Sequence, residues 1–242
     1  MKRLSVLLDD LTVIRSALSD DKIDPVRFGV IAETAGANGL VCTITGKGKG
    51  VIERDLKMLK AIKQSYFNLR MPIDNEAMRL ALAILPDMVT FVDIATGDSR
   101  KVGPVEPGIH QTEIESMLPN LQANNITVSV LLKPDIESLK AISKLSVDYV
   151  EIDVSEYTGA SDINDEIVAL DRIKSAALAV GKWGMGVNCS GNIGYEDLDG
   201  LAQTPNLEDI TIGTSLIRRA LYVGIDQAVG EALQLMRHRE ID

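Results

Sequence analysis

The stretch TIGTSLIRRAL, residues 211–221, joins an apolar segment to a helix-like segment through a turn of small residues. Its first two residues end an apolar-rich run that begins at Leu207, and Gly213, Thr214 and Ser215 follow directly. A strand, a small polar turn and a helix in this order are half of a βαβ unit. If such units fill the chain, this turn lies at the carboxyl end of a strand.

Short apolar runs of strand length recur along the whole chain. Several are nearly continuous in Val, Ile and Leu, which is typical of parallel strands buried on both faces. The runs cover residues 4–8, 39–44, 66–71, 88–92, 127–132, 149–152, 185–187 and 209–212. Helical patterns lie between and after them, at residues 26–35, 53–63, 75–85, 112–123, 136–145, 164–180, 215–223 and 226–237.

This alternation predicts one α/β domain over residues 1–242, a single (β/α)8 TIM barrel with extra helices. The helix at 226–237 is an addition to the eight units. The length of 242 residues is close to the usual ~250 residues of this fold. A doubly wound open sheet is the alternative that the same pattern leaves open.

Charge and composition exclude several classes of protein. The net charge is −10 and the basic residues are scattered, so we expect no nucleic-acid partner. No apolar stretch has the length of a membrane span, and the first residues contain too short an apolar run for a signal peptide. Cys42 and Cys189 lie far apart in the sequence, as do His110 and His238, so we expect no metal site built on cysteine or histidine. With this use of cysteine, we expect a cytoplasmic protein.

In a barrel of this kind, the active site lies where the strands end. The polar residues at those positions are the candidate site. The candidates for catalysis are Asp9, Asp10, Arg70, Lys133, Glu151 and Asp153. The candidates for binding substrate or phosphate are Thr43, Thr45, Asn188, Ser190, Gly191, Asn192, Gly213, Thr214 and Ser215.

The turns after the seventh and eighth strands favour phosphate binding. Phosphate sites in these barrels often lie there, because the backbone N–H groups at a helix N-terminus attract anions. Both turns consist of small residues with hydroxyl groups or amides. The alternative is that Thr214 or Ser215 only caps the following helix. The segment GKGKG (46–50) is either a mobile lid over a phosphate or a solvated loop.

The charged candidates also leave alternatives open. Lys133 is either a Schiff-base lysine or a cation that pairs with Glu151 or Asp153. The carboxylates either transfer protons, hold Mg²⁺ together with a substrate phosphate, or pair with Arg70 and Lys133.

Several motifs resemble one known family, the pyridoxine 5'-phosphate synthases. They are DPVRFGVIAETAGANGL (24–40), VIERDLKMLK (51–60), NLRM (68–71), YVEID (149–153), VNCSGN (187–192) and TIGTSLIRRAL (211–221). The resemblance implies a (β/α)8 barrel with extra helices, assembled as an octamer of dimers, without a metal or organic cofactor. It also implies condensation of 1-deoxy-D-xylulose 5-phosphate with 3-amino-1-hydroxyacetone 1-phosphate to pyridoxine 5'-phosphate.

The chain departs from the family's pattern at the site itself. The family's first strand reads Val-Asn-Ile-Asp-His, whereas this chain has Val-Leu-Leu-Asp-Asp at 6–10. The catalytic glutamate of the third strand is Arg70, and the histidine after Glu151 is Asp153. The His-Leu-Arg of the second strand is Thr-Ile-Thr at 43–45. Gly-His-Gly after the seventh strand is Ser-Gly-Asn at 190–192, and Gly-His after the eighth is Gly-Thr at 213–214.

Two functions are compatible with these residues. The first is an enzyme that acts on a small phosphorylated substrate held at the seventh and eighth strand ends, with a substrate or reaction changed from that of the family. The second is a non-catalytic member that binds a phosphorylated metabolite or pairs with an active subunit. Retention of the scaffold with polar replacements at its mouth is typical of a new function on an old fold.

Overall fold

The eight longest strands pair in parallel and close into a barrel. The computed structural model describes residues 2–20, 22–45, 51–95 and 102–237. Around the barrel the order is β1, β10, β9, β8, β7, β4, β3, β2. Their bounds are β1 Arg3–Leu7, β2 Gly39–Thr43, β3 Tyr66–Met71, β4 Met88–Phe91, β7 Thr127–Leu132, β8 Tyr149–Asp153, β9 Gly186–Ser190 and β10 Leu207–Ile212. The predicted (β/α)8 barrel is therefore confirmed, and the open sheet is wrong.

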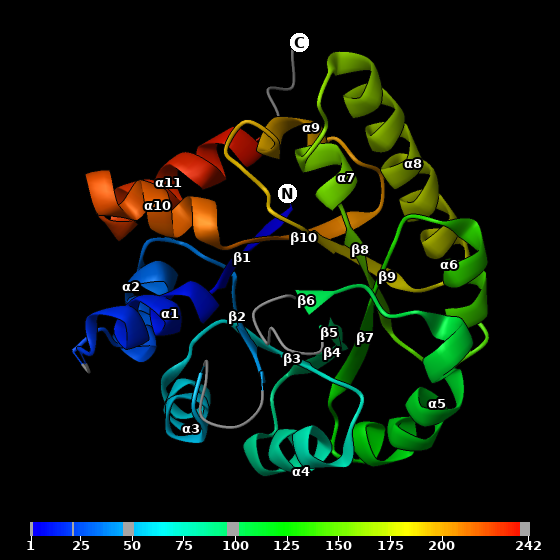
Figure 1. The fold of residues 1–242 in the computed structure, drawn as a ribbon, viewed down its shortest axis with the longest axis horizontal. Coiled ribbons are helices and arrows are strands. Elements are labelled where there is room, and N and C mark those ends of the chain that lie inside the picture. The colour runs from blue at the N-terminus through cyan, green and yellow to red at the C-terminus, as the bar shows by residue number, and fades with distance from the viewer. Residues whose placement is uncertain (1, 21, 46–50, 96–101, 238–242) are drawn as a thin grey trace.

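Helices surround the barrel on the outside (Figure 1). The long ones are α1 Asp9–Leu18, α2 Pro25–Thr34, α3 Glu53–Ile62, α4 Asn75–Ile84, α5 Pro107–Ala123, α6 Ile136–Ile142, α8 Ile163–Lys182, α10 Thr214–Val223 and α11 Ile225–Met236. Gly29 on α2 lies against Leu8, Leu40 and Leu59, and a Cβ there would be 3.0–3.4 Å from their side chains. Glycine thus lets α2 approach the strands closely, and the buried leucines exclude water from the contact.

Five described elements are absent from the sequence prediction. They are helix α1, the short helices α7 Ser155–Thr158 and α9 Leu198–Ala202, and a hairpin of β5 Asp93–Ile94 with β6 Val102–Gly103. Helix α1 starts after Leu8 with no side-chain cap, so the usual start signal is absent. As a result, Asp9 and Asp10 form the first turn of α1 instead of ending the first strand.

The interior of the barrel is polar. Ser5 on β1 donates a hydrogen bond to Asp209 on β10 at 2.9 Å, and Thr90 on β4 donates to Asn68 on β3 at 3.0 Å. All four residues are buried. Barrels of this fold more often fill their interior with branched aliphatic side chains. Here the inward-facing hydrogen bonds form a polar floor beneath the carboxyl ends of the strands.

Within the described segments, no helix combines the length and the apolar character that crossing a membrane requires.

Candidate functional site

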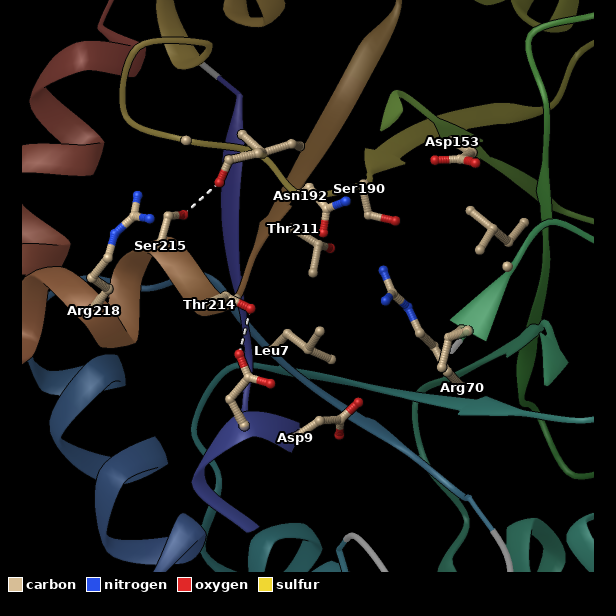
Figure 2. Close-up of a pocket in the computed structure, with 18 of the residues that line it drawn as sticks. Leu7, Asp9, Arg70, Asp153, Ser190, Asn192, Thr211, Thr214, Ser215 and Arg218 are labelled. Carbon is tan, nitrogen blue, oxygen red and sulfur yellow. Dashed lines mark hydrogen bonds between the residues drawn. The ribbon is translucent and has the colours of Figure 1, made fainter. Parts of the chain in front are cut away.

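A pocket with a volume of about 470 Å³ opens at the carboxyl ends of the strands (Figure 2). We call it the central pocket. Most of the predicted site residues line it, namely Asp9, Asp10, Arg70, Asp153, Ser190, Gly191, Asn192, Gly213, Thr214 and Ser215. Residues from opposite ends of the sequence therefore meet at one site, as the barrel topology requires.

The start of α10 forms one wall of the central pocket. Gly213 is the N-cap residue and no side chain caps the helix. The hydroxyl of Thr214 donates instead to the carboxylate of Asp10, and the hydroxyl of Ser215 donates to the carbonyl of Ile193. The interpretation that Thr214 or Ser215 only caps the helix is therefore wrong. The first N–H groups of a helix have no partner within it and, with the helix dipole, favour an anion.

The loop between β9 and α9 forms the adjoining wall. Gly191 has φ +131° and Asn192 has φ +50°, so the backbone turns sharply after β9. Asp153 accepts a hydrogen bond from the amide of Ser155 at 3.0 Å, and a Cβ on Gly191 would lie 2.6 Å from the same carboxylate oxygen. Thr158 donates to the carbonyl of Gly191 at 2.9 Å. Thr158 thus holds the loop through Gly191, and the close approach of Asp153 leaves no room for a side chain there.

Three further polar residues line the pocket that sequence reasoning missed: Thr211, Glu196 and Arg218. Arg218 is exposed and lies four residues after Thr214 on α10. Residues four apart share one face of a helix, so the spacing from Thr214 was a signal that could have identified it. Its guanidinium lies on the same side of the pocket as Ser215 (Figure 2).

Arg70 and Glu151 form a buried ion pair beneath the pocket. The Arg70 guanidinium bonds to the Glu151 carboxylate, and the hydroxyl of Ser190 donates to the same oxygen at 2.5 Å. The two charged side chains are 6% and 1% exposed. Glu151 therefore does not line the pocket, whereas the tip of Arg70 points into it (Figure 2). The alternative that a mouth carboxylate pairs with Arg70 is confirmed for Glu151.

Asp9 is the pocket carboxylate with the most altered acidity. Burial raises the pKa of Asp9 to about 6, although hydrogen bonding by Thr43 and the charge of Arg70 act in the opposite direction. The amide of Thr43 donates to the carboxylate at 2.8 Å, which fixes its orientation. A carboxyl group that titrates near neutral pH suits general acid–base catalysis.

Besides Glu151, four predicted residues lie outside the lining of the central pocket. Thr43 and Asn188 are buried below it, and Thr45 follows β2 outside its lining. Lys133 is exposed and lines a second pocket of about 520 Å³ beside Asp93, Glu106 and Asp135. Among the described residues, no ion pair joins Lys133 to Glu151 or to Asp153. The structure thus does not bring Lys133 to the other candidates.

Metal binding was one alternative for the carboxylates. Within the described ranges, no group of three or more His, Cys, Asp or Glu side chains is placed to hold a metal ion. Cys42 and Cys189 are buried, and burial raises the pKa of both thiols well above the ordinary value. The segment 46–50, for which the sequence left a lid and a solvated loop open, lies outside the described residues, as does His238.

Solved structures resemble the chain in fold. A thiamine phosphate pyrophosphorylase from Pyrococcus furiosus superposes with a TM-score of 0.63 at 15% identity, over 97% of this chain and 95% of that one. A phosphoribosyl anthranilate isomerase from Thermotoga maritima gives 0.62 at 9% identity, over 98% and 99%. At such identities the likeness concerns the barrel alone.

Proteins related in sequence identify the family to which the chain belongs. A protein of Citrifermentans bemidjiense named pyridoxine 5'-phosphate synthase is 32% identical over 238 residues, which cover 98% of this chain and all of the relative. One of Geobacter sulfurreducens with the same name is 30% identical with the same coverage. The family model described as pyridoxal phosphate biosynthesis protein PdxJ matches residues 4–238. The chain therefore belongs to the PdxJ family of pyridoxal phosphate biosynthesis proteins.

Proposed function

We propose that the chain is an enzyme that binds a small phosphorylated substrate in the central pocket. The phosphate group lies against the start of α10 and the β9–α9 loop, where the amides of Thr214 and Ser215 and the guanidinium of Arg218 gather. One observation carries the proposal: this anion-binding wall and Asp9, with its pKa raised to about 6, line the same pocket. A substrate held by its phosphate there extends toward a group that can move a proton.

Asp9 is the proposed general acid or base. Its carboxylate lines the pocket and is oriented by the Thr43 amide, which donates to one of its oxygens. Arg70 points into the same space and is anchored by Glu151, so it can polarise a carbonyl or hydroxyl oxygen of the substrate. Proton transfer beside a polarised carbonyl suits condensation, aldol-type and isomerisation chemistry.

The name of the curated relatives gives the first candidate reaction, which is the synthesis of pyridoxine 5'-phosphate in vitamin B6 biosynthesis. We propose a condensation of this kind with a changed substrate or reaction. The replacement of the family's histidines and of its third-strand glutamate by Asp10, Arg70, Asp153 and Thr214 supports the change.

A non-catalytic phosphometabolite-binding protein is the second candidate. One observation favours it: Arg70 and Glu151 neutralise each other at the floor of the pocket. In that function, the start of α10 and the β9–α9 loop still bind the phosphate, and the Arg70–Glu151 pair serves only to stabilise the barrel.

The direct test is a product assay. Purified protein is mixed with 1-deoxy-D-xylulose 5-phosphate and 3-amino-1-hydroxyacetone 1-phosphate, and pyridoxine 5'-phosphate is sought by mass spectrometry beside an active relative. The changed-reaction proposal predicts no pyridoxine 5'-phosphate, together with turnover of another phosphorylated compound in a metabolite library. That turnover must fall strongly in Asp9→Asn and persist in Asp226→Asn, a matched change at an exposed position on α11.

The other possible outcomes distinguish the candidate functions or test the role of Asp9. Pyridoxine 5'-phosphate formed in an Asp9-dependent manner would contradict the changed reaction and establish the relatives' activity for this chain. Binding of phosphorylated compounds without turnover of any would support the non-catalytic protein. Turnover that is unaffected in Asp9→Asn would remove Asp9 from the mechanism.

A further inference from the structure

A carboxylate lies inside the proposed phosphate-binding wall. Asp10 lines the central pocket, and one of its oxygens accepts the hydrogen bond from the hydroxyl of Thr214 at the start of α10. Among the described residues, its other oxygen has no hydrogen-bond partner. Asp10 is held at one oxygen, and the second is available to a ligand that also contacts α10.

A carboxylate beside an anion-binding site favours a ligand that carries a proton over one that carries none. Two oxygens that both lack a proton repel each other at hydrogen-bonding distance, since neither can donate. A phosphate monoester that keeps one proton can instead donate it to Asp10 while its other oxygens accept from the α10 amides. We propose that Asp10 makes the central pocket selective for the singly protonated, monoanionic form of a phosphate monoester. This inference rests on the proposed function.

The other charged groups around the pocket also favour a monoanion over a dianion. Carboxylates outnumber cations in the described lining, and Arg70 is already paired with Glu151. Asp9 lies next to Asp10 on α1. The charged groups that line the pocket from other elements are Arg70, Asp153, Glu196 and Arg218. A ligand with two negative charges meets more repulsion here than a ligand with one.

The test compares two methyl esters of equal charge. Methyl phosphate is a monoanion with a proton below its second pKa, whereas methyl sulfate is a monoanion without one. Each is titrated into 15N-labelled protein at pH 5.5 and pH 7.5, and the amide shifts of Thr214 and Ser215 report binding. A hydrogen bond to a charged group is worth about 1.5–3 kcal/mol, so at pH 5.5 methyl phosphate should bind at least ~10-fold more tightly than methyl sulfate.

The pH dependence supplies the second readout. With a second phosphate pKa near 6, the apparent affinity for methyl phosphate should fall about 25-fold from pH 5.5 to pH 7.5. Asp9 titrates in the same way with either ester, so the methyl sulfate titration corrects for changes in the protein. Asp10→Asn can donate as well as accept, so it should bind both esters within ~3-fold of each other at both pH values. Asp226→Asn should behave as the unchanged protein does.

The outcomes separate this inference from the function on which it rests. Equal binding of the two esters at pH 5.5 by the unchanged protein would overturn the role of Asp10 and leave the phosphate site standing. This comparison needs no variant, so it holds even if Asp10→Asn does not fold. No shift of the α10 amides with either ester at any pH would overturn the phosphate site, and the role of Asp10 with it.

Discussion

Arg70 on β3 and Glu151 on β8 meet across the interior of the barrel as a buried ion pair. Two strands, β4 and β7, separate β3 from β8 around the barrel, so the pair links positions that no backbone ladder joins. Ser190 on β9 donates a second hydrogen bond to the carboxylate. The charge at the floor of the pocket is therefore fixed by three strands at once.

Removal of either partner should destabilise the barrel. R70M or E151L leaves one buried charge without its partner, and we expect each to lower the free energy of unfolding by about 3–5 kcal/mol. The double variant R70M/E151L removes both charges, so its loss should be smaller than the sum by at least ~2 kcal/mol. Urea denaturation at pH 7 measures all three. Additive losses would mean that the pair has no coupling energy.

Asp9 should make the protein less stable as the pH rises from 4 to 6. Its pKa is about 6 in the folded protein, above the ordinary 3.8, so in this window the folded state binds the proton more tightly than the unfolded state. The stabilisation is complete below pH 4 and is lost as the pH rises through 6. At 1.36 kcal/mol per unit of pKa, the loss is at most about 3 kcal/mol.

Asp9→Asn isolates this contribution, because its amide oxygen can still accept from Thr43. The free energy of unfolding of the variant, relative to the unchanged protein, should increase from pH 4 to pH 7. Burial also raises the pKa of Asp209 to about 6, but that group is common to both proteins and cancels. A relative stability that stays flat over this range would show that Asp9 keeps an ordinary pKa.

The β9–α9 loop should not tolerate a side chain at Gly191. With φ +131° and Asp153 and Ser155 within 2.8 Å of a Cβ, Gly191→Ala should cost about 1–3 kcal/mol. Gly230 on α11 is the matched control, since a Cβ there meets no atom within 4 Å. Gly230→Ala should instead stabilise the protein by about 0.5–1 kcal/mol. Thermal unfolding of both variants compares them, and equal effects would contradict the strain.

The sequence predicted two strands to the residue. The run at 66–71 matches β3 although Asn68 and Arg70 face the polar interior, and the run at 127–132 matches β7. The strand predicted at 185–187 was too short, because in β9 Asn188 and Ser190 face the polar interior and interrupt the apolar run. Helix α1 was missed because Leu8 provides no capping side chain.

The sequence predicted which strand ends form the site, but not which side chains interact there. Because the barrel fixes which residues follow each strand, Ser190, Gly213 and their neighbours were placed correctly around one pocket. Which of them pair could not be read from the sequence, since the choice of Arg70 over Lys133 as the partner of Glu151 depends on the direction of side chains across the barrel. Arg218 was missed because it lies one turn into α10, beyond the strand ends at which barrel site residues are expected.

The most direct test of the account is whether the central pocket recognises a phosphate group through α10. Isothermal titration of a phosphorylated compound that the protein binds, taken from the metabolite library, and of the same compound without its phosphate measures what the phosphate contributes. The account predicts that the phosphorylated compound binds at least ~10-fold more tightly, as expected for charge-assisted hydrogen bonds. This ratio should fall in Arg218→Ala and persist in Arg79→Ala, a matched change at an exposed position on α4. Equal affinity for the two compounds, or a ratio that Arg218→Ala leaves unchanged, would contradict a phosphate site at this wall of the barrel.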